Sequence, residues 1–411
     1  MFRLTVHSMV ALAVGTGMFA YAEEHVVKPG PEAQEAAQEA MILAQPGDTI
    51  LFDEGKFDFT IGLSLDVDNV TLKGRGSDKT ILSFKGQELG SEGILITSNG
   101  VICEDFAVED TKGDGIKAKG CEGITFRRVR AEWTNGPAET NGAYGFYPVE
   151  SKNVLIEHCE VYACSDAGIY VGQSKNIIVR RNTVKFNVAG IEIENSLHAD
   201  VYENHATQNT GGILVFDMPD LPMTGGGFVR VFNNTIEKND TPNFAPKGNI
   251  VATVPTGTGM MIMSNENVEV FNNTFKDNQS ANVLIVSYTT TGNPVKEPHR
   301  YDPYPEGVHI HSNTFERGGY APQGSLAAMA EMTGGKLANI VWDGAVDAKK
   351  KVNGELPADK RIYIHGNEGA DFINLNLDAL STGNGEPAIL RDMAAHEGKL
   401  PSLPAIAIPG A

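Results

Sequence analysis

The chain has 411 residues, with 52 acidic and 33 basic side chains and a formal net charge of −19. This acidity argues against a nucleic-acid partner or an anionic membrane surface, because both repel negative charge. After the first residues, no stretch is long and apolar enough to span a membrane.

The N-terminal segment predicts export. Residues 1–22, MFRLTVHSMVALAVGTGMFAYA, combine the early Arg3, an apolar run and small residues ending at Ala22. These are the features of a secretory signal peptide cleaved near Ala22, so we expect a secreted or periplasmic protein. Residues 23–381 are then expected to form one domain, and the proline-rich residues 382–411 an extended tail.

Residues 32–45 predict a short amphipathic helix. Ala, Gln and Glu alternate there with apolar residues at helical spacing, and Pro46-Gly47 ends the pattern. We expect this helix to cap the open end of the architecture that follows. Short strands are predicted next, at residues 49–53, 63–65, 70–72 and 80–84.

From there a repeated unit organises the chain, and it is clearest in residues 168–189, GIYVGQSKNIIVRRNTVKFNVA. Each unit is a glycine followed by three short apolar strands separated by turns, and most units are 22 or 23 residues apart. Strands without helices at this period indicate an all-β solenoid in which each repeat is one coil. The glycine position is taken by Gly93, Gly115, Gly145, Gly168, Gly190, Gly212 and Gly259, and once by Asn282.

The register of the repeat predicts which side chains point inward, because successive residues of a strand face opposite sides. One inward column of the second strand is Phe126, Ile156, Val179, Val201, Val231, Val270, Ile310 and Ile364. Asparagines stand at the corners, where stacked amides can bond to each other and to turn backbone, so we expect a structural role. The two corner columns are Asn182, Asn204, Asn234, Asn273, Asn313 and Asn367, and Asn187, Asn209, Asn239 and Asn278.

Four cysteines are too few for a disulfide scaffold in a chain of this length. Cys159 and Cys164 occupy corner positions that Asn fills in later coils, so we expect buried thiols. A Cys159–Cys164 bridge is the alternative, and the pairing of Cys103 and Cys121 is left open.

Four insertions interrupt the period, at 132–143, 218–227, 240–257 and 288–306. They leave the coil beside the glycine-led strand, and insertions in a solenoid gather on the binding face. We therefore place the candidate site in a groove over the outer face of that strand. The substrate-binding candidates there are Trp133, Tyr144, Glu150, Phe216, Arg300 and Tyr301.

The same outer face carries groups able to transfer protons. The catalytic candidates are Lys117, Lys119, Tyr147 and Tyr170, since Lys and Tyr can act as acid or base. Coils lie about 4.8 Å apart, so Lys117 and Glu192 should be about 14 Å apart, a span that suits a few sugar units. Glu192, Glu194 and Asp217 are candidate Ca²⁺ ligands. The alternative is an ordinary solvated strand face.

The second strands carry a candidate transition-metal site. His309 lies two residues before His311 on one face, and His365 should lie one coil away. Three imidazoles so placed suit Zn²⁺ or Cu²⁺. The alternative is that they continue an outward aromatic stack, which stabilises a sheet.

The repeat, the cap helix with residues 45–49 (QPGDT), and the Asn corners resemble the right-handed parallel β-helix repeat proteins of the pectin-lyase-like superfamily. Pectate lyases, alginate lyases and mannuronan C5-epimerases typify it. Residues 144–150, YGFYPVE, are similar to the epimerase signature Tyr-Gly-Phe-Asp-Pro-His-Asp/Glu. Tyr147 and Val149 replace the Asp and His that supply the acid/base chemistry in that signature. The matching residues beside them are Tyr144, Pro148 and Glu150.

The resemblance implies binding or modification of an extracellular polysaccharide, such as one that contains uronic acids, by lyase-like or epimerase-like chemistry. Whether the protein is an enzyme stays open at this point. The alternative is a non-catalytic periplasmic scaffold, or a β-helix protein that binds metal or matures a metalloenzyme. We expect Ca²⁺ as the only cofactor of the groove, and a monomer.

Overall fold

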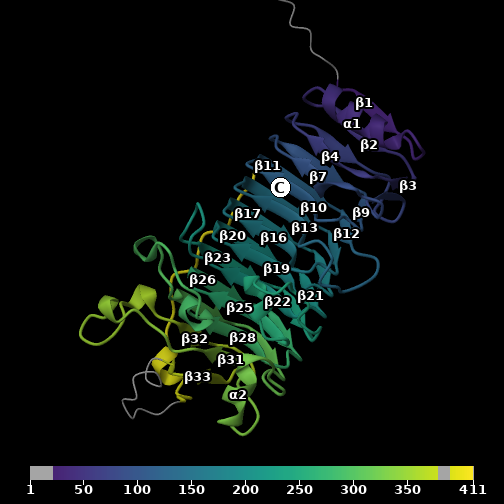
Figure 1. The fold of residues 1–411 in the computed structure, drawn as a ribbon. Coiled ribbons are helices and arrows are strands. Elements are labelled where there is room, and N and C mark those ends of the chain that lie inside the picture. The colour runs from purple at the N-terminus through teal and green to yellow at the C-terminus, as the bar shows by residue number, and fades with distance from the viewer. Residues whose placement is uncertain (1–21, 378–388, 411) are drawn as a thin grey trace, which may run out of the picture.

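The structure, a computed structural model, describes residues 22–377 and 389–410. The predicted signal peptide and the predicted boundary at residue 381 lie outside these residues. The chain winds into three parallel sheets that run along one solenoid (Figure 1). Among the described residues, no helix has the length and apolar character needed to cross a membrane.

The glycine-led strands form an 11-stranded sheet, called here the glycine-led sheet. Its strands are β4 (Ile61–Leu65), β7 (Leu89–Ile96), β10 (Asp114–Lys119), β13 (Tyr144–Val149), β16 (Ala167–Gly172), β19 (Ala189–Glu194), β22 (Gly211–Phe216), β25 (Thr258–Met263), β28 (Ala281–Val286), β31 (Ile340–Trp342) and β33 (Phe372–Asn374).

The second strand of each coil belongs to a 12-stranded sheet, called here the histidine sheet. Its strands are β1 (Glu24–Val27), β2 (Thr49–Phe52), β5 (Thr71–Lys73), β8 (Val101–Glu104), β11 (Glu122–Arg127), β14 (Lys152–Glu157), β17 (Lys175–Arg180), β20 (Leu197–Tyr202), β23 (Gly227–Phe232), β26 (Glu266–Phe271), β29 (Glu306–His311) and β32 (Tyr363–His365).

A third, 10-stranded sheet closes the coil with short strands. These are β3 (Gly55–Asp58), β6 (Thr80–Ser83), β9 (Ala107–Glu109), β12 (Arg130–Glu132), β15 (Glu160–Tyr162), β18 (Thr183–Lys185), β21 (His205–Thr207), β24 (Thr235–Glu237), β27 (Thr274–Lys276) and β30 (Thr314–Glu316). Helix α1 (Ala33–Leu43) covers the N-terminal end as predicted, and α2 (Ser325–Glu331) lies near the other end (Figure 1).

The predicted register is confirmed. Along the histidine sheet Phe126, Ile156 and Val179 are paired in successive strands, and the column continues in the same register to Ile364. All its members are buried in one continuous apolar core. Fully burying one such side chain stabilises the fold by about 1.5–3 kcal/mol, so the stacked columns dominate the stability of the solenoid.

Both asparagine columns are hydrogen-bonded ladders. Asn204, for example, donates from Nδ2 to the Val179 carbonyl at 2.9 Å and to Asn234 Oδ1 at 3.0 Å. Cys159 and Cys164 occupy the corner positions ahead of the Asn ladders, and their backbone N–H groups donate to the first Asn of each ladder. All four cysteines are buried and free, so the alternative Cys159–Cys164 bridge is wrong.

The insertions fold over the glycine-led sheet rather than flanking an open groove. From β16 through β28 every residue of these strands is buried. Residues from the insertions, including Val251, Val254, Tyr288 and Tyr301, join an apolar cluster on the outer face of this sheet. The open part of the face is therefore confined to the strands before β16.

The tail follows the flank of the solenoid instead of only covering its C-terminal end. The backbone N–H of Leu403 donates to Glu269 Oε2 at 2.9 Å, and that of Ile406 donates to Asp200 Oδ2 at 3.1 Å. In Figure 1 the yellow segment runs back beside the coils toward the N-terminal half. Buried carboxylates of the histidine sheet thus hold this extended segment through hydrogen bonds to its backbone.

Candidate active site

A tyrosine–carboxyl cluster, made of Tyr144, Tyr147, Tyr170, Asp166, Glu192 and Glu194, lies where the open face of the glycine-led sheet meets its covered part. The three aromatic rings are in mutual contact, with centroids 4.5–5.0 Å apart. Tyr147 and Tyr170 come from the predicted outward column, because β13 and β16 are adjacent in register. Two adjacent coils are therefore joined by direct contact of their rings.

Lys117 adds a positive charge at the open edge of the cluster. Its Nζ lies 4.7 Å from the centroid of the Tyr147 ring and 3.3 Å from Glu92 Oε1. The Lys117 side chain is 23% exposed, so its ammonium group can be reached from solvent. The cation and the phenol thus share one surface.

Tyr170 connects the rings to the carboxyl groups. Its hydroxyl donates to Glu194 Oε1 at 2.7 Å, and both residues are buried. Gly172 makes this geometry possible, because a Cβ at that position would lie 2.3 Å from the Tyr170 hydroxyl oxygen. The small residue that follows Tyr170 on the same face thus leaves space for its ring.

Burial is the main cause of the carboxyl groups' high proton affinity. It raises the pKa of Asp166 to about 7, with the charge of Glu194 adding to the effect. The pKa of Glu192 rises well above its ordinary value for the same reasons, and its Oε2 has no hydrogen-bond partner. Burial likewise raises the pKa of Asp114, beside Lys117, to about 6. Asp114 and Asp166 can therefore hold or release a proton near neutral pH.

The phenols keep their protons. Burial, followed by the charge of Asp114, raises the pKa of Tyr147 to about 12. Burial and the neighbouring carboxylates also raise the pKa values of Tyr144 and Tyr170. Tyr147 is accordingly suited to donate a proton, whereas a carboxyl group is the better base.

Three of the predicted substrate-binding residues are not accessible in this structure. Trp133 is buried and donates from Nε1 to the Thr111 carbonyl at 2.8 Å, while Phe216 is fully buried under the insertions. Tyr301 is buried and donates to the Asp217 carbonyl at 2.7 Å. These three side chains therefore cannot contact a ligand in this structure. The insertions, which were expected to border the groove, fill part of it instead.

The remaining predicted residues have mixed positions. Lys119 and Glu150 are exposed on the open face, on the same side of the solenoid as Lys117. Arg300 is exposed but pairs with Glu297 at 2.6 Å in the last insertion, away from the cluster's coils. Of the predicted binding residues, Tyr144 alone has ring contacts with the tyrosines of the cluster.

The predicted calcium ligands do not form one oxygen cage. Asp217 accepts from the backbone N–H groups of Gly225 and Gly226, both at 3.0 Å, and so anchors an insertion. Glu194 is committed to Tyr170. In the described ranges, the groups whose ligand atoms converge within 4.8 Å include none of these three carboxylates. Calcium binding by these three residues therefore stays a prediction.

A cavity of about 670 Å³ continues the same face toward the C-terminal end. Met261, Leu284 and Val286 of the glycine-led strands line it, together with residues of the third insertion and α2. Its lining is largely apolar, unlike the cluster three coils earlier. The two features divide the face into a polar open part and an apolar enclosed part.

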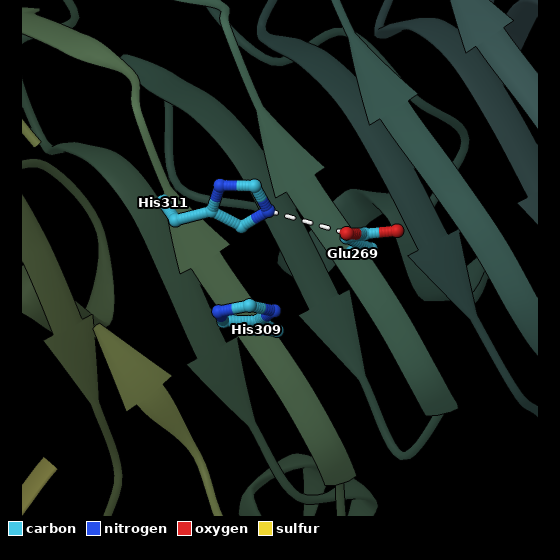
Figure 2. A group of neighbouring side chains, drawn as sticks. All are labelled: Glu269, His309 and His311. Atoms are coloured by element: carbon cyan, nitrogen blue, oxygen red, sulfur yellow. Dashed lines mark hydrogen bonds and ion pairs between the residues drawn. The ribbon is translucent and has the colours of Figure 1, made fainter. Parts of the chain in front are cut away.

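The predicted histidine group is assembled on the histidine sheet. His309 Nε2 lies 2.9 Å from His365 Nε2, and His311 stacks against His365 with centroids 5.4 Å apart. His311 Nε2 also lies 3.2 Å from Glu269 Oε1 (Figure 2). Burial, followed by the neighbouring imidazoles, lowers the pKa of His309 to about 4, so this ring is neutral at physiological pH.

Two acidic residues of these sites were not predicted from the sequence. Asp166 stands just before a glycine-led strand, at a position where the two neighbouring coils have Ala143 and Val188. An acid at a position that is apolar in the adjacent coils could have identified Asp166 as a candidate. Glu269 is paired in register with His309, one coil before it. The predicted register therefore already placed an acid beside the imidazoles.

Comparisons with known proteins agree on the fold. The family described as "Right handed beta helix region" matches residues 70–221. Searching the curated protein sequences gives no match. Among solved structures, the mannuronan C-5 epimerase AlgE4 A-module of Azotobacter vinelandii has 17% identity and a TM-score of 0.53, covering 77% of this chain and 88% of that one.

Two further structures are similar at lower scores. The Azotobacter vinelandii mannuronan C-5 epimerase AlgE6 A-module has 17% identity and a TM-score of 0.47, covering 84% of this chain and 91% of that one. Pectate lyase Pel9A has 13% identity and a TM-score of 0.38, covering 73% and 77%. With three all-parallel sheets and this family match over residues 70–221, the chain has the fold of a right-handed parallel β-helix.

Proposed function

We propose that this protein, exported from the cytoplasm, binds an acidic polysaccharide over the open glycine-led strands and modifies it at the tyrosine–carboxyl cluster. The reaction proposed is removal of the proton next to a uronate carboxylate, followed by β-elimination or by return of a proton to the opposite face. The observation that carries the proposal is the contact chain from Lys117 through the Tyr147 and Tyr170 rings to Glu194.

Each group in the chain has a distinct task. Lys117 offsets the negative charge that develops on the uronate as its C5 proton leaves. Asp166, with a pKa of about 7, accepts this proton at neutral pH. Tyr147, with its pKa of about 12, supplies a proton to the leaving oxygen or to the new face of the sugar. Neighbouring side chains therefore supply both the group that accepts the C5 proton and the group that donates a proton.

The surrounding surface supports an extended, acidic ligand. Lys119 lies two residues from Lys117 on the same open strand, so two ammonium groups give this strand a local positive charge in a chain of net charge −19. An aromatic surface such as that of Tyr147 stacks on sugar rings. The likeness to an epimerase module concerns the fold, so the reaction rests on these side chains.

The test is turnover of a panel of acidic polysaccharides, among them alginate and pectate, by the full mature chain. Unsaturated products are followed by ultraviolet absorbance and epimerised residues by NMR. Tyr147→Phe and Asp166→Asn should lower either activity at least about a hundredfold, as expected for loss of a general acid or base. Tyr162→Phe is the matched control, because Tyr162 lies on the third sheet and its hydroxyl donates to Glu160 at 2.7 Å, as that of Tyr170 does to Glu194 in the cluster. Equal activity of all variants would contradict the proposed site.

A further inference from the structure

We propose that Glu269, His309, His311 and His365 form a site for one tetrahedral transition-metal ion of the Zn²⁺ class. This site lies on the histidine sheet and is independent of the proposed polysaccharide chemistry. Figure 2 shows the Glu269 carboxylate and the His309 and His311 rings facing one another above adjacent strands.

The solenoid itself brings the four residues together. Glu269 of β26 is paired with His309 of β29, and His311 is paired with His365 of β32. His309 and His311 are two residues apart, so they leave the same face of one strand. Three successive coils therefore present one carboxylate and three imidazoles in a single patch.

Two distances are close to those of a tetrahedral site. Ligand atoms about 2.0–2.1 Å from Zn²⁺ lie about 3.3 Å apart along each edge of the tetrahedron. His309 Nε2 and His365 Nε2 are 2.9 Å apart, and His311 Nε2 and Glu269 Oε1 are 3.2 Å apart, so these two pairs correspond to opposite edges. Ligand atoms of Glu269, His309 and His311 all lie within 4.8 Å of one another. His365 is outside this group of three, so its imidazole has to turn toward the group to complete the tetrahedron.

A second observation points to an occupant. His309 is 4% exposed, yet its Nδ1 has no hydrogen-bond partner, and its Nε2 faces only another imidazole. A metal ion on Nε2 would replace this contact between two imidazole nitrogens, while Nδ1 points away from the ion. One carboxylate with three imidazoles is also a typical ligand set for Zn²⁺ and Cu²⁺.

The C-terminal tail covers the patch. Leu403 N–H donates to Glu269 Oε2, and residues 400–403 line a cavity of about 210 Å³ together with Glu269 and His309. The other converging acidic group, Glu266, Asp302 and Glu306, differs in that Lys350 and Lys360 already neutralise it. Its carboxylates are therefore not offered as ligands.

Zn²⁺ binding to the full, untagged chain tests the proposal, with calorimetry after chelator treatment. We expect one ion per chain, and an affinity at least about tenfold lower in His309→Ala, His311→Ala, His365→Ala and Glu269→Gln. His205→Ala is the matched control, because His205 pairs with Glu237 at 3.2 Å without further imidazoles. It should bind Zn²⁺ like the parent.

Two readouts separate lost binding from lost folding. Zn²⁺ should raise the thermal midpoint of the parent and of His205→Ala but not of His311→Ala, whose side chain is 18% exposed and tolerates truncation. Bound Co²⁺ should give the intense visible bands of tetrahedral coordination. No bound Zn²⁺, weak octahedral Co²⁺ bands, or unchanged affinity in the four variants would overturn the proposal.

Discussion

Replacing Asp166 by Asn should remove the pH dependence that this carboxyl group gives to the free energy of unfolding. Asp166 is 6% exposed, and burial raises its pKa from 3.8 to about 7. A carboxyl group whose pKa is higher in the folded state contributes stability below pH 3.8, and this contribution is lost as the pH rises through about 7. Asn has the same size and stays neutral, so the variant escapes that loss.

The magnitude follows from the two pKa values. The interval from 3.8 to about 7 corresponds to about 4 kcal/mol, at about 1.4 kcal/mol for each pH unit. Because Asn249 Nδ2 donates to Asp166 Oδ2 at 3.0 Å, the amide oxygen of the variant can still accept that bond. At about pH 8 the variant should exceed the parent by up to about 4 kcal/mol, and at about pH 4 the two should be nearly equal.

Urea unfolding of parent and variant across this pH range measures the effect. Asp58→Asn, at an exposed position of β3, is the control and should leave the pH dependence of the parent unchanged. A parent whose stability does not fall between about pH 4 and pH 8, or a variant that follows the same curve, would refute the reasoning about the buried carboxyl groups.

Three further predictions concern the scaffold. Asn204→Ala removes several ladder hydrogen bonds and should lower the free energy of unfolding by about 2–4 kcal/mol in urea titrations. Asn176→Ala is the comparison: it breaks one half-buried hydrogen bond and should lower the free energy of unfolding by less than about 1.5 kcal/mol. Gly172→Ala should displace the Tyr170 ring and abolish polysaccharide turnover while the protein stays folded by circular dichroism. All four thiols should react with a thiol reagent only after unfolding, and a reductant should leave the thermal midpoint unchanged, because the cysteines are buried and unpaired.

The coil register could be predicted because its signals are local and repeated. The inward column through Val179 and Val201, and the Asn corners, recur once per coil, so each coil checks the assignment of the next. The three imidazoles followed from the same register. Glu269 was equally available by counting one coil back from His309.

Positions of the insertions could not be predicted in the same way. Asn249 meets Asp166 across 83 residues, and Leu403 meets Glu269 across 134, through contacts that no periodicity encodes. Phe216 is buried by a similar nonlocal packing of insertion residues on the outer face of the glycine-led sheet. The sequence therefore predicted which side chains face outward on the glycine-led sheet, while the part of that face that stays open depends on nonlocal packing.

Exchange of the uronate C5 proton with solvent deuterium is the most direct test of the central claim, because it registers proton removal whether elimination or epimerisation follows. Alginate and pectate would be incubated with the mature chain in D₂O and examined by NMR. The account predicts deuterium at C5 with the parent and with Tyr162→Phe, and a loss of at least about a hundredfold with Asp166→Asn. Exchange that persists unchanged in Asp166→Asn and in an Asp114→Asn variant, or no exchange with a folded parent that binds the polysaccharide, would contradict it.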